Sequence, residues 1–350
     1  MKKVRLGAVN WDASLTRDTY FGFYQINSLS QAKYRTWVPF YADIIDRERV
    51  SYHERSPEEY EAEMRYAIDA GLDYFAFVWY PTEGSRLHEQ TSFNDCSHKV
   101  YELTLARRLY EKSSLTEKLG MCAILAAHPF TDGDIEELAD AFERPYYERL
   151  EGRPLLYVYG AYRHEVLEKI KLVCEKRGKP APYVAQMTSS SPKKADCPLA
   201  DALSAYAVCA DGTATYAELV ERALTDGRAK LGGDFKLIPT FTVGWDPTPR
   251  IERPTPWTTK ADGTTGYRGE IFAKRASGAE LLQGAKTFAD FIKTEVKGSF
   301  VGHVLTFAWN EFEEGGFFCP TYTEKGGTDA TRVKIFAEIA ELWRGELGEI

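Results

Sequence analysis

The sequence has little of what marks a nucleic-acid-binding or a membrane protein. Its 44 Lys and Arg residues are outnumbered by 52 Asp and Glu residues, the net charge is −8, and the basic residues form no stripe. Because nucleic-acid-binding proteins neutralise phosphates with clustered Lys and Arg, this composition argues against a nucleic-acid partner. No apolar run reaches the length of about 18 residues that suggests a transmembrane helix, so we expect no membrane association.

A secretory signal is also missing from the N-terminus. The basic start at 1–3 is followed by no apolar stretch of signal-peptide length. The six cysteines contain no CxxC pair and are scattered: Cys96, Cys122, Cys174, Cys197, Cys209 and Cys319. They predict reduced thiols. We therefore expect a cytoplasmic protein, or a periplasmic or secreted one if a leader segment has been removed.

Several cofactor motifs are absent as well. The sequence has no G-x-G-x-x-G or P-loop phosphate loop and no G-x-S-x-G nucleophile elbow. His88 and His98 flank a loop that contains Glu89 and Asp95, but this spacing matches no known set of metal ligands. We predict neither a cofactor nor a metal ion. The sequence leaves the oligomeric state open.

What the sequence does contain is a regular alternation of apolar runs and amphipathic segments. Eight runs predict strands, at about 4–10, 74–80, 121–128, 155–159, 183–188, 202–208, 235–243 and 301–310. Seven amphipathic segments predict helices, at 57–70, 99–112, 134–142, 162–176, 216–231, 279–296 and 331–344. This order predicts a single (β/α)₈ TIM barrel that covers 1–350 without a domain linker. An open, doubly wound sheet is the alternative.

Residues beyond the needs of a minimal barrel are concentrated in three segments, 11–56, 81–98 and 244–277. They follow the first, second and seventh predicted strands. They are therefore expected as long βα loops at the C-terminal face, where barrel enzymes keep their active sites. The first and third segments are rich in aromatic residues, as loops that bind a sugar would be.

The densest group of candidate catalytic residues follows the eighth predicted strand, in residues 309–315, W-N-E-F-E-E-G. Neighbouring carboxylates oppose each other's ionisation, which favours one protonated and one ionised group, the pair that glycosidases use. Glu311 and Glu314 share a face only if the strand stops near Asn310 and a turn follows, as the two glycines after the motif favour. Glu313 would then point away as a structural or solvated carboxylate. A solvated acidic turn is the alternative.

A second group follows the seventh strand, in residues 244–250, G-W-D-P-T-P-R. Trp245 offers a stacking face, Asp246 can bind sugar hydroxyls, and Arg250 can orient a carboxylate through two hydrogen bonds. The alternative is a proline-stiffened turn with an internal Asp–Arg pair.

Further candidates for substrate binding stand at the ends of other strands: Asp12, Tyr80, His128, Tyr206 and Asn310. A side chain at the mouth of a barrel can hydrogen-bond a sugar or a catalytic carboxylate. Trp79 precedes Tyr80 and is expected in the core by alternation along the strand.

Residues 309–315 resemble the N-E-W-x-E-G motif that closes the last barrel strand in family 99 of the glycoside hydrolases, the endo-α-mannosidases, and in WbsX-like proteins of polysaccharide gene clusters. Residues 244–250 are similar to the W-D-N-T-P-R turn of the WbsX-like branch. The two motifs occur in the same order after strands seven and eight. This sequence differs at Phe312, where the family usually has Trp, and at Glu313, where the mannosidases have His.

The resemblance implies a barrel that hydrolyses an α-linked sugar, such as an α-mannoside-like glycan, with retention of configuration. The residue matching Glu311 would be the general base on the 2-hydroxyl, giving a 1,2-anhydro sugar. The residue matching Glu314 would act as acid and then as base at the leaving group and water. We therefore predict a retaining glycoside hydrolase with a carbohydrate substrate. The alternatives are a WbsX-like polysaccharide-processing or glycosyltransferase-type protein and a non-catalytic glycan-binding barrel, in which the two carboxylates would point apart.

Overall fold

The computed structural model describes residues 4–11, 20–82, 105–125, 128–209, 214–258 and 275–348. Its main sheet has parallel strands in the order β10-β9-β8-β7-β5-β4-β1-β12-β11, with β6 (Arg149–Leu150) antiparallel to β7. The bounds are β1 Arg5–Asn10, β4 Tyr74–Trp79, β5 Gly120–Leu125, β7 Arg153–Val158, β8 Tyr183–Met187, β9 Ala202–Ser204, β10 Lys236–Leu237, β11 Thr240–Thr242 and β12 His303–Phe307. All eight predicted strands are therefore found, with bounds that are shifted or shortened by a few residues.

The sheet closes at the seventh predicted strand, which is divided into β10 and β11. β10 pairs with β9, and β11 pairs with β12. Between these two short strands, the amide of Ile238 donates to the carbonyl of Leu203 at 3.0 Å, and the carbonyl of Pro239 accepts from the amide of Leu305 at 3.1 Å. One segment of chain thus joins both ends of the sheet. The predicted (β/α)₈ barrel is confirmed, and the open doubly wound alternative is wrong.

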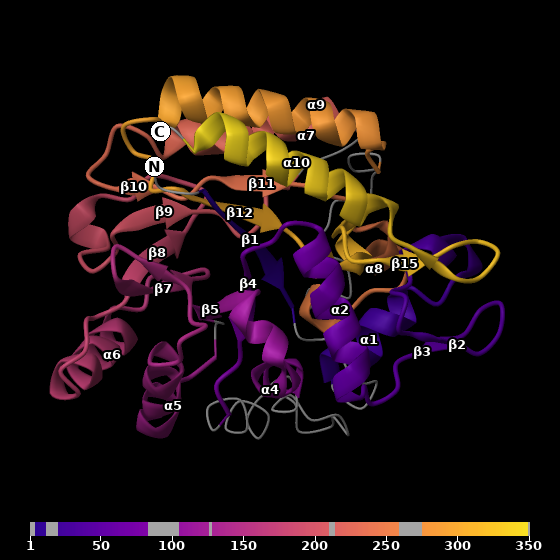
Figure 1. Ribbon diagram of the computed structural model, residues 1–350, viewed down its shortest axis with the longest axis horizontal. Helices are drawn as coiled ribbons and strands as arrows, with labels where there is room; N and C mark the ends of the chain where they lie inside the picture. Colours follow the sequence, from indigo (N-terminus) through magenta and orange to yellow (C-terminus); the bar gives the residue numbers. More distant parts are fainter. Residues whose placement is uncertain are drawn as a thin grey trace.

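Helices pack around the outside of the barrel, with α7, α9 and α10 together on one side (Figure 1). The bounds are α2 Pro57–Asp69, α4 Leu105–Lys112, α5 Asp132–Phe142, α6 His164–Lys176, α7 Tyr216–Ala229, α9 Gly278–Phe291, continued by a π-helix at Ile292–Val296, and α10 Thr331–Leu347. The start of α2 shows how the sequence sets these bounds. The Ser56 side chain accepts from the amide of Glu59, whose carboxylate accepts from the amide of Ser56, so both groups cap the helix.

The shorter elements lie towards the carboxyl ends of the strands, where the arrowheads of β11 and β12 point in Figure 1. They are α1 Tyr20–Ser28, η2 Ala32–Trp37, β2 Asp43–Ile44, β3 Val50–Ser51, α8 Thr248–Glu252, η6 Pro256–Thr258, β13 Asn310–Glu311, η8 Phe312–Glu314, β14 Gly316–Phe317, β15 Thr321–Tyr322 and β16 Thr328–Asp329. Elsewhere, η4 covers Ser114–Glu117 and η5 covers Lys194–Asp196. The loops after the first and seventh strands thus carry elements of their own. Parts of all three predicted loops, 12–19, 83–104 and 259–274, lie outside the described residues.

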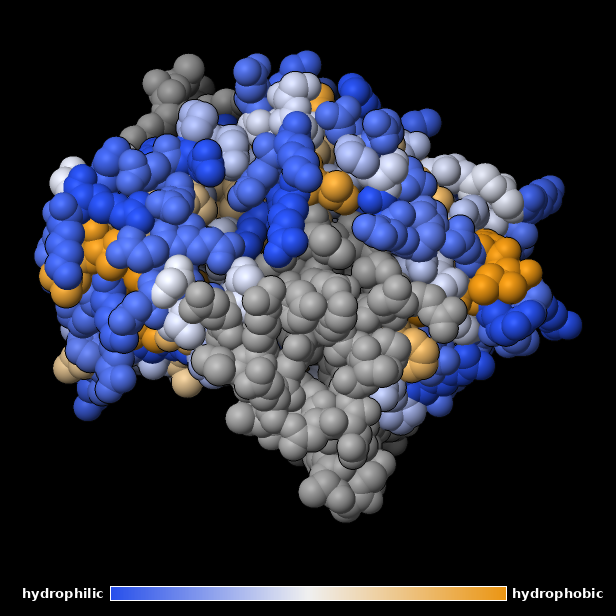
Figure 2. All heavy atoms as spheres, turned by 90° about the horizontal axis from the view of Figure 1, so that it is seen from below, coloured by the Kyte–Doolittle hydropathy of each residue, from blue (hydrophilic) through white to orange (hydrophobic). Residues whose placement is uncertain are grey.

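The described surface gives no sign of a membrane-crossing segment. Within the described ranges, no helix combines the length and the apolar composition needed to span a bilayer. The coloured part of the face in Figure 2 is largely hydrophilic, with hydrophobic side chains in small separate patches. The cytoplasmic location and the single-domain organisation stay predictions.

Candidate active site

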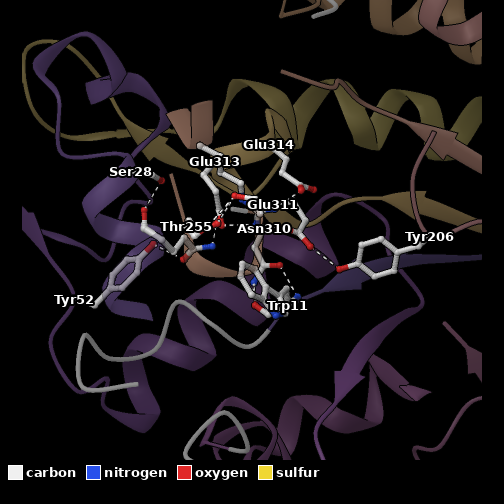
Figure 3. A network of polar contacts seen from close by, with 12 residues as sticks. Trp11, Ser28, Tyr52, Tyr206, Thr255, Asn310, Glu311, Glu313 and Glu314 are labelled. Carbon is white, nitrogen blue, oxygen red and sulfur yellow. Dashed lines mark hydrogen bonds and ion pairs between the residues drawn. The ribbon is translucent and has the colours of Figure 1, made fainter. Parts of the chain in front are cut away.

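The acidic motif forms a tight turn after the last barrel strand. β13 ends at Glu311, η8 covers the next three residues, and Gly315 ends the turn with a φ of 69°. The strand therefore stops next to Asn310, and the turn that follows allows the side chains of Glu311 and Glu314 to share a face. Figure 3 shows these two carboxyl groups on the side of Tyr206, whereas Glu313 is turned towards Tyr52.

The two sequence motifs meet through their main chains. The amide of Asp246 donates to the carbonyl of Glu314 at 2.6 Å. A Cβ atom on Gly244 would lie 2.5 Å from the carbonyl oxygen of Gly315, and a Cβ on Gly315 would lie 2.9 Å from the amide nitrogen of Asp246. Glycine at both positions allows this approach. The contact directs α8, which begins at Thr248, towards the acidic turn.

Arg250, on α8, joins the three carboxylates of the turn and is 5% exposed. Its Nη1 contacts Oε1 of Glu314, and its Nη2 donates to Oε1 of Glu313 at 2.7 Å. The same Nη2 lies 3.7 Å from Oε2 of Glu311. The arginine thus contacts two carboxylates directly and approaches the third.

The alternative of an Asp–Arg pair inside the 244–250 turn is wrong. Asp246 accepts hydrogen bonds from the hydroxyl of Thr248 and, at 3.1 Å, from its amide. The Asp246 carboxylate therefore holds the start of α8. A role in binding sugar hydroxyls stays a prediction for this residue.

Glu311 lies in a strongly perturbing environment. It is 3% exposed, and its Oε1 accepts from the hydroxyl of Tyr206 at 2.5 Å. Its Oε2 has no hydrogen-bond partner among the described residues. Burial, followed by the charge of Glu314, raises the pKa of Glu311 well above 4.5, although Arg250 opposes this shift. Burial and the nearby carboxylates thus favour the protonated form of Glu311.

Tyr206, Tyr80 and His128 follow three different strands, β9, β4 and β5 respectively, of which only β4 and β5 are neighbours. Burial and the charge of Glu311 raise the pKa of Tyr206, so its hydroxyl stays a donor. Tyr80 accepts from Nε1 of Trp11 at 2.9 Å, and its ring centroid lies 5.0 Å from that of His128. Trp79 is fully buried, so its predicted place in the core is confirmed.

Asn310 joins the ends of the first and eighth strands. Its side-chain oxygen accepts from the amide of Trp11 at 2.7 Å, and its side-chain nitrogen donates to the carbonyl of Trp11 at 2.6 Å and to Asn10 at 3.1 Å. The amide group is therefore used within the protein, which favours a positioning role over contact with a sugar. Asp12 lies outside the described residues.

A cavity of about 570 Å³ opens beside Glu314 and is also lined by Tyr206 and Trp245. Tyr159 lines it as well, is 45% exposed, and has its ring centroid 4.9 Å from that of Tyr206. Tyr159 was not predicted as a site residue, although its place at the end of the fourth predicted strand, 155–159, was a usable signal. The other lining residues are Gly160, Met187, Thr188, Ser189, Ala205, Ala207, Cys209 and Asp226.

Metal ligands do not gather in the described part of the chain. There, no group of three or more His, Cys, Asp and Glu side chains is arranged to hold a metal ion. Cys122, Cys174, Cys197 and Cys319 are free thiols. The loop with His88 and His98 lies outside the described residues.

No protein-family model matches the sequence, and no curated protein matches it. Solved structures are similar in fold. A family 99 endo-α-mannosidase from Bacteroides thetaiotaomicron, bound to Bis-Tris-propane, has a TM-score of 0.58 and 14% identity, covering 99% of this chain and 100% of that chain. Another structure of a family 99 endo-α-mannosidase from this organism has a TM-score of 0.54 and 15% identity over 89% and 84% of the two chains. A glycoside hydrolase-like protein has a TM-score of 0.59 and 12% identity over 97% and 94%. At these identities the likeness concerns the fold, and the chain has the barrel fold of the family 99 glycoside hydrolases.

Proposed function

We propose that this protein is a retaining glycoside hydrolase that acts on an α-linked glycan, with Glu311 and Glu314 as its catalytic pair. The observation that carries the proposal is the placement of both carboxyl groups on one side of the turn, at the carboxyl end of the barrel (Figure 3). Glu314 also lines the adjoining cavity. Two carboxyl groups in different environments meet the requirement of acid/base hydrolysis.

In the proposed reaction, Glu311 takes the proton of the sugar 2-hydroxyl while that oxygen attacks C1. The bond from C1 to the leaving oxygen breaks, and Glu314 gives this oxygen its proton. Water then attacks C1 of the 1,2-anhydro sugar and passes a proton to Glu314. The C1–O2 bond breaks, and O2 regains its proton from Glu311. Two inversions at C1 give net retention.

These roles require a shift of one proton within the pair. We place the proton of the unliganded pair on Glu311, because burial disfavours the ionised form of Glu311 and Arg250 contacts Glu314. The reaction starts with Glu311 ionised and Glu314 protonated. Since Nη2 of Arg250 is already 3.7 Å from Glu311, a closer contact on substrate binding would favour that exchange. The number of protons on the pair does not change.

The substrate class is proposed from the resemblance of the motif and from the fold of the endo-α-mannosidases. The cavity beside Glu314 has aromatic faces, from Trp245 and Tyr159, on which a sugar ring can stack. A glycosyltransferase would need a site for the donor phosphate, and the sequence has no recognisable phosphate loop. A glycan-binding barrel has no need for a buried carboxyl pair with a shared arginine. Hydrolysis is therefore the function favoured here.

The test is hydrolysis of a panel of α-linked manno-oligosaccharides, with proton NMR of the first product released. We expect cleavage with the α-anomer formed first. The Glu311→Gln/Glu314→Gln double variant serves as the blank for contaminating glycosidases. Release of the β-anomer first would contradict retention, and failure to cleave any α-linked glycan would contradict the proposed activity.

A further inference from the structure

Glu313 lies in the same turn but has a different set of partners. It is fully buried, with 0% exposure, and its Oε1 accepts from Nη2 of Arg250 at 2.7 Å. Its Oε2 accepts from the side-chain nitrogen of Gln25 at 2.8 Å. Both oxygens are therefore engaged within the protein. The predicted orientation away from the pair agrees with Figure 3, where Glu313 faces Tyr52.

Gln25 fixes Glu313 from the loop after the first strand. Its side-chain oxygen accepts from the hydroxyl of Tyr52 at 2.8 Å, so its amide group can present only its nitrogen to Glu313. Gln25 and Tyr52 are both buried. A chain of hydrogen bonds thus runs from Tyr52 through Gln25 and Glu313 to Arg250.

Two aromatic rings limit where the Arg250 guanidinium can lie. Its central carbon is 5.5 Å from the ring centroid of Trp11 and 5.7 Å from that of Trp257. These two rings are 5.9 Å apart and nearly perpendicular. With Glu313 on one nitrogen and Glu314 on the other, the guanidinium is held on both sides of its fork.

We propose that Glu313 is a positioning residue that holds Arg250 against Glu314 and thereby keeps the shared proton on Glu311 until substrate binds. This inference rests on the proposed catalytic pair. Among the described residues, the charged groups at this point are Arg250, Glu311, Glu313 and Glu314, and the hydroxyls that face them belong to Tyr52, Tyr159 and Tyr206. The position of the Arg250 cation relative to the three buried carboxylates influences which of them is ionised.

The test is a titration that needs no substrate. Glutamate carboxyl carbons are labelled with ¹³C, and the Glu311 signal is assigned by its loss in Glu311→Gln. Glu313→Gln removes one negative charge and frees Nη2 of Arg250 to approach Glu311. We expect the titration midpoint of Glu311 to lie at lower pH than in the wild type. For any substrate that the protein cleaves, the alkaline limb of the pH profile of kcat/KM should shift in the same direction.

Glu63→Gln is the matched control, because Glu63 is another buried glutamate paired with an arginine. It pairs with Arg55 and accepts from Nε1 of Trp309 at 2.6 Å, without a described contact to Arg250. A purely structural role for Glu313 would make both variants lose stability and leave the Glu311 midpoint unchanged, which would overturn the proposal. If the wild type cleaves no glycan yet the midpoint moves only in Glu313→Gln, the positioning role stands and the hydrolase proposal fails.

Discussion

The amide of Asp246 and the carbonyl of Glu314 form a 2.6 Å hydrogen bond that joins the loops after the seventh and eighth strands. This single main-chain contact brings Arg250 to the acidic turn. It depends on the close approach of Gly315 to the Asp246 backbone. The proposed catalytic carboxylates and their arginine are thus positioned together by two loops that are about 65 residues apart in sequence.

Gly315→Ala should disturb this contact and the fold around it. The added Cβ would meet the Asp246 amide at 2.9 Å, and the φ of 69° is itself unfavourable for alanine. We expect a loss of roughly 2 kcal/mol or more in the free energy of unfolding, measured by urea denaturation, and at least a tenfold fall in kcat/KM. Gly152→Ala is the control, because Gly152 has a φ of 78° with nothing within 4 Å of the added Cβ. Equal effects of the two substitutions would contradict the close approach.

Tyr206→Phe should shift the pH profile in a defined direction. In the proposed mechanism the pair of Glu311 and Glu314 is active while it carries one proton. Loss of that proton from Glu311 at high pH lowers kcat/KM and so determines the alkaline limb of its pH profile. The hydroxyl of Tyr206 favours the ionised form of Glu311, so its removal raises the pKa of Glu311 further. The alkaline limb should therefore move to higher pH, with kcat reduced about tenfold. Tyr157→Phe removes a buried hydroxyl that contacts Tyr74 instead, and should leave the limb in place.

Glu311→Gln should make the protein more stable than the wild type at alkaline pH. Because burial raises the pKa of Glu311 above 4.5, the folded state binds more protons than the unfolded state between the two pKa values. Stability of the wild type therefore falls as pH rises through that window, and the neutral glutamine removes this loss. We expect the free energy of unfolding of Glu311→Gln to exceed that of the wild type by about 1 kcal/mol or more at pH 8, with little difference below pH 4. Denaturation curves across pH check this, and a pH-independent difference would argue against a perturbed Glu311.

Glu314→Gln should show a dependence on the leaving group that Glu311→Gln does not show. A general acid matters most when the leaving oxygen is basic, so aryl glycosides with acidic phenols should recover much of the lost rate in Glu314→Gln. Glu311→Gln should stay slow on every substrate, because the attack by the 2-hydroxyl still lacks its base. Rates on a series of aryl α-mannosides distinguish the two roles. The opposite pattern would exchange the assignments of acid and base.

Local sequence signals predicted much of the fold. The apolar runs located all eight strands, and the amphipathic segment 57–70 located α2. The division of the seventh strand was not predicted. Pro239 has no amide to donate at that point, yet its carbonyl still serves the neighbouring strand. Such a division depends on strands that are distant in sequence, which a local pattern cannot identify.

The candidate site was predicted in its residues but less well in its contacts. The two glycines after the motif correctly indicated the turn that places Glu311 and Glu314 on one side (Figure 3). The partners of Arg250 were not predicted, because its pairing is decided by the packing of two loops in space. Gln25 was missed, since a glutamine within a helix gives no signal of contact with Glu313.

The most direct test of the central claim is kcat/KM for Glu311→Gln and Glu314→Gln on a glycan with an unactivated leaving group that the wild type cleaves. Glu63→Gln is measured beside them as a buried glutamate outside the pair. Our account predicts that each of the first two substitutions lowers kcat/KM by about 10²–10⁴-fold while the folded structure is retained, with a much smaller effect of Glu63→Gln. Wild-type rates in both Glu311→Gln and Glu314→Gln would contradict it.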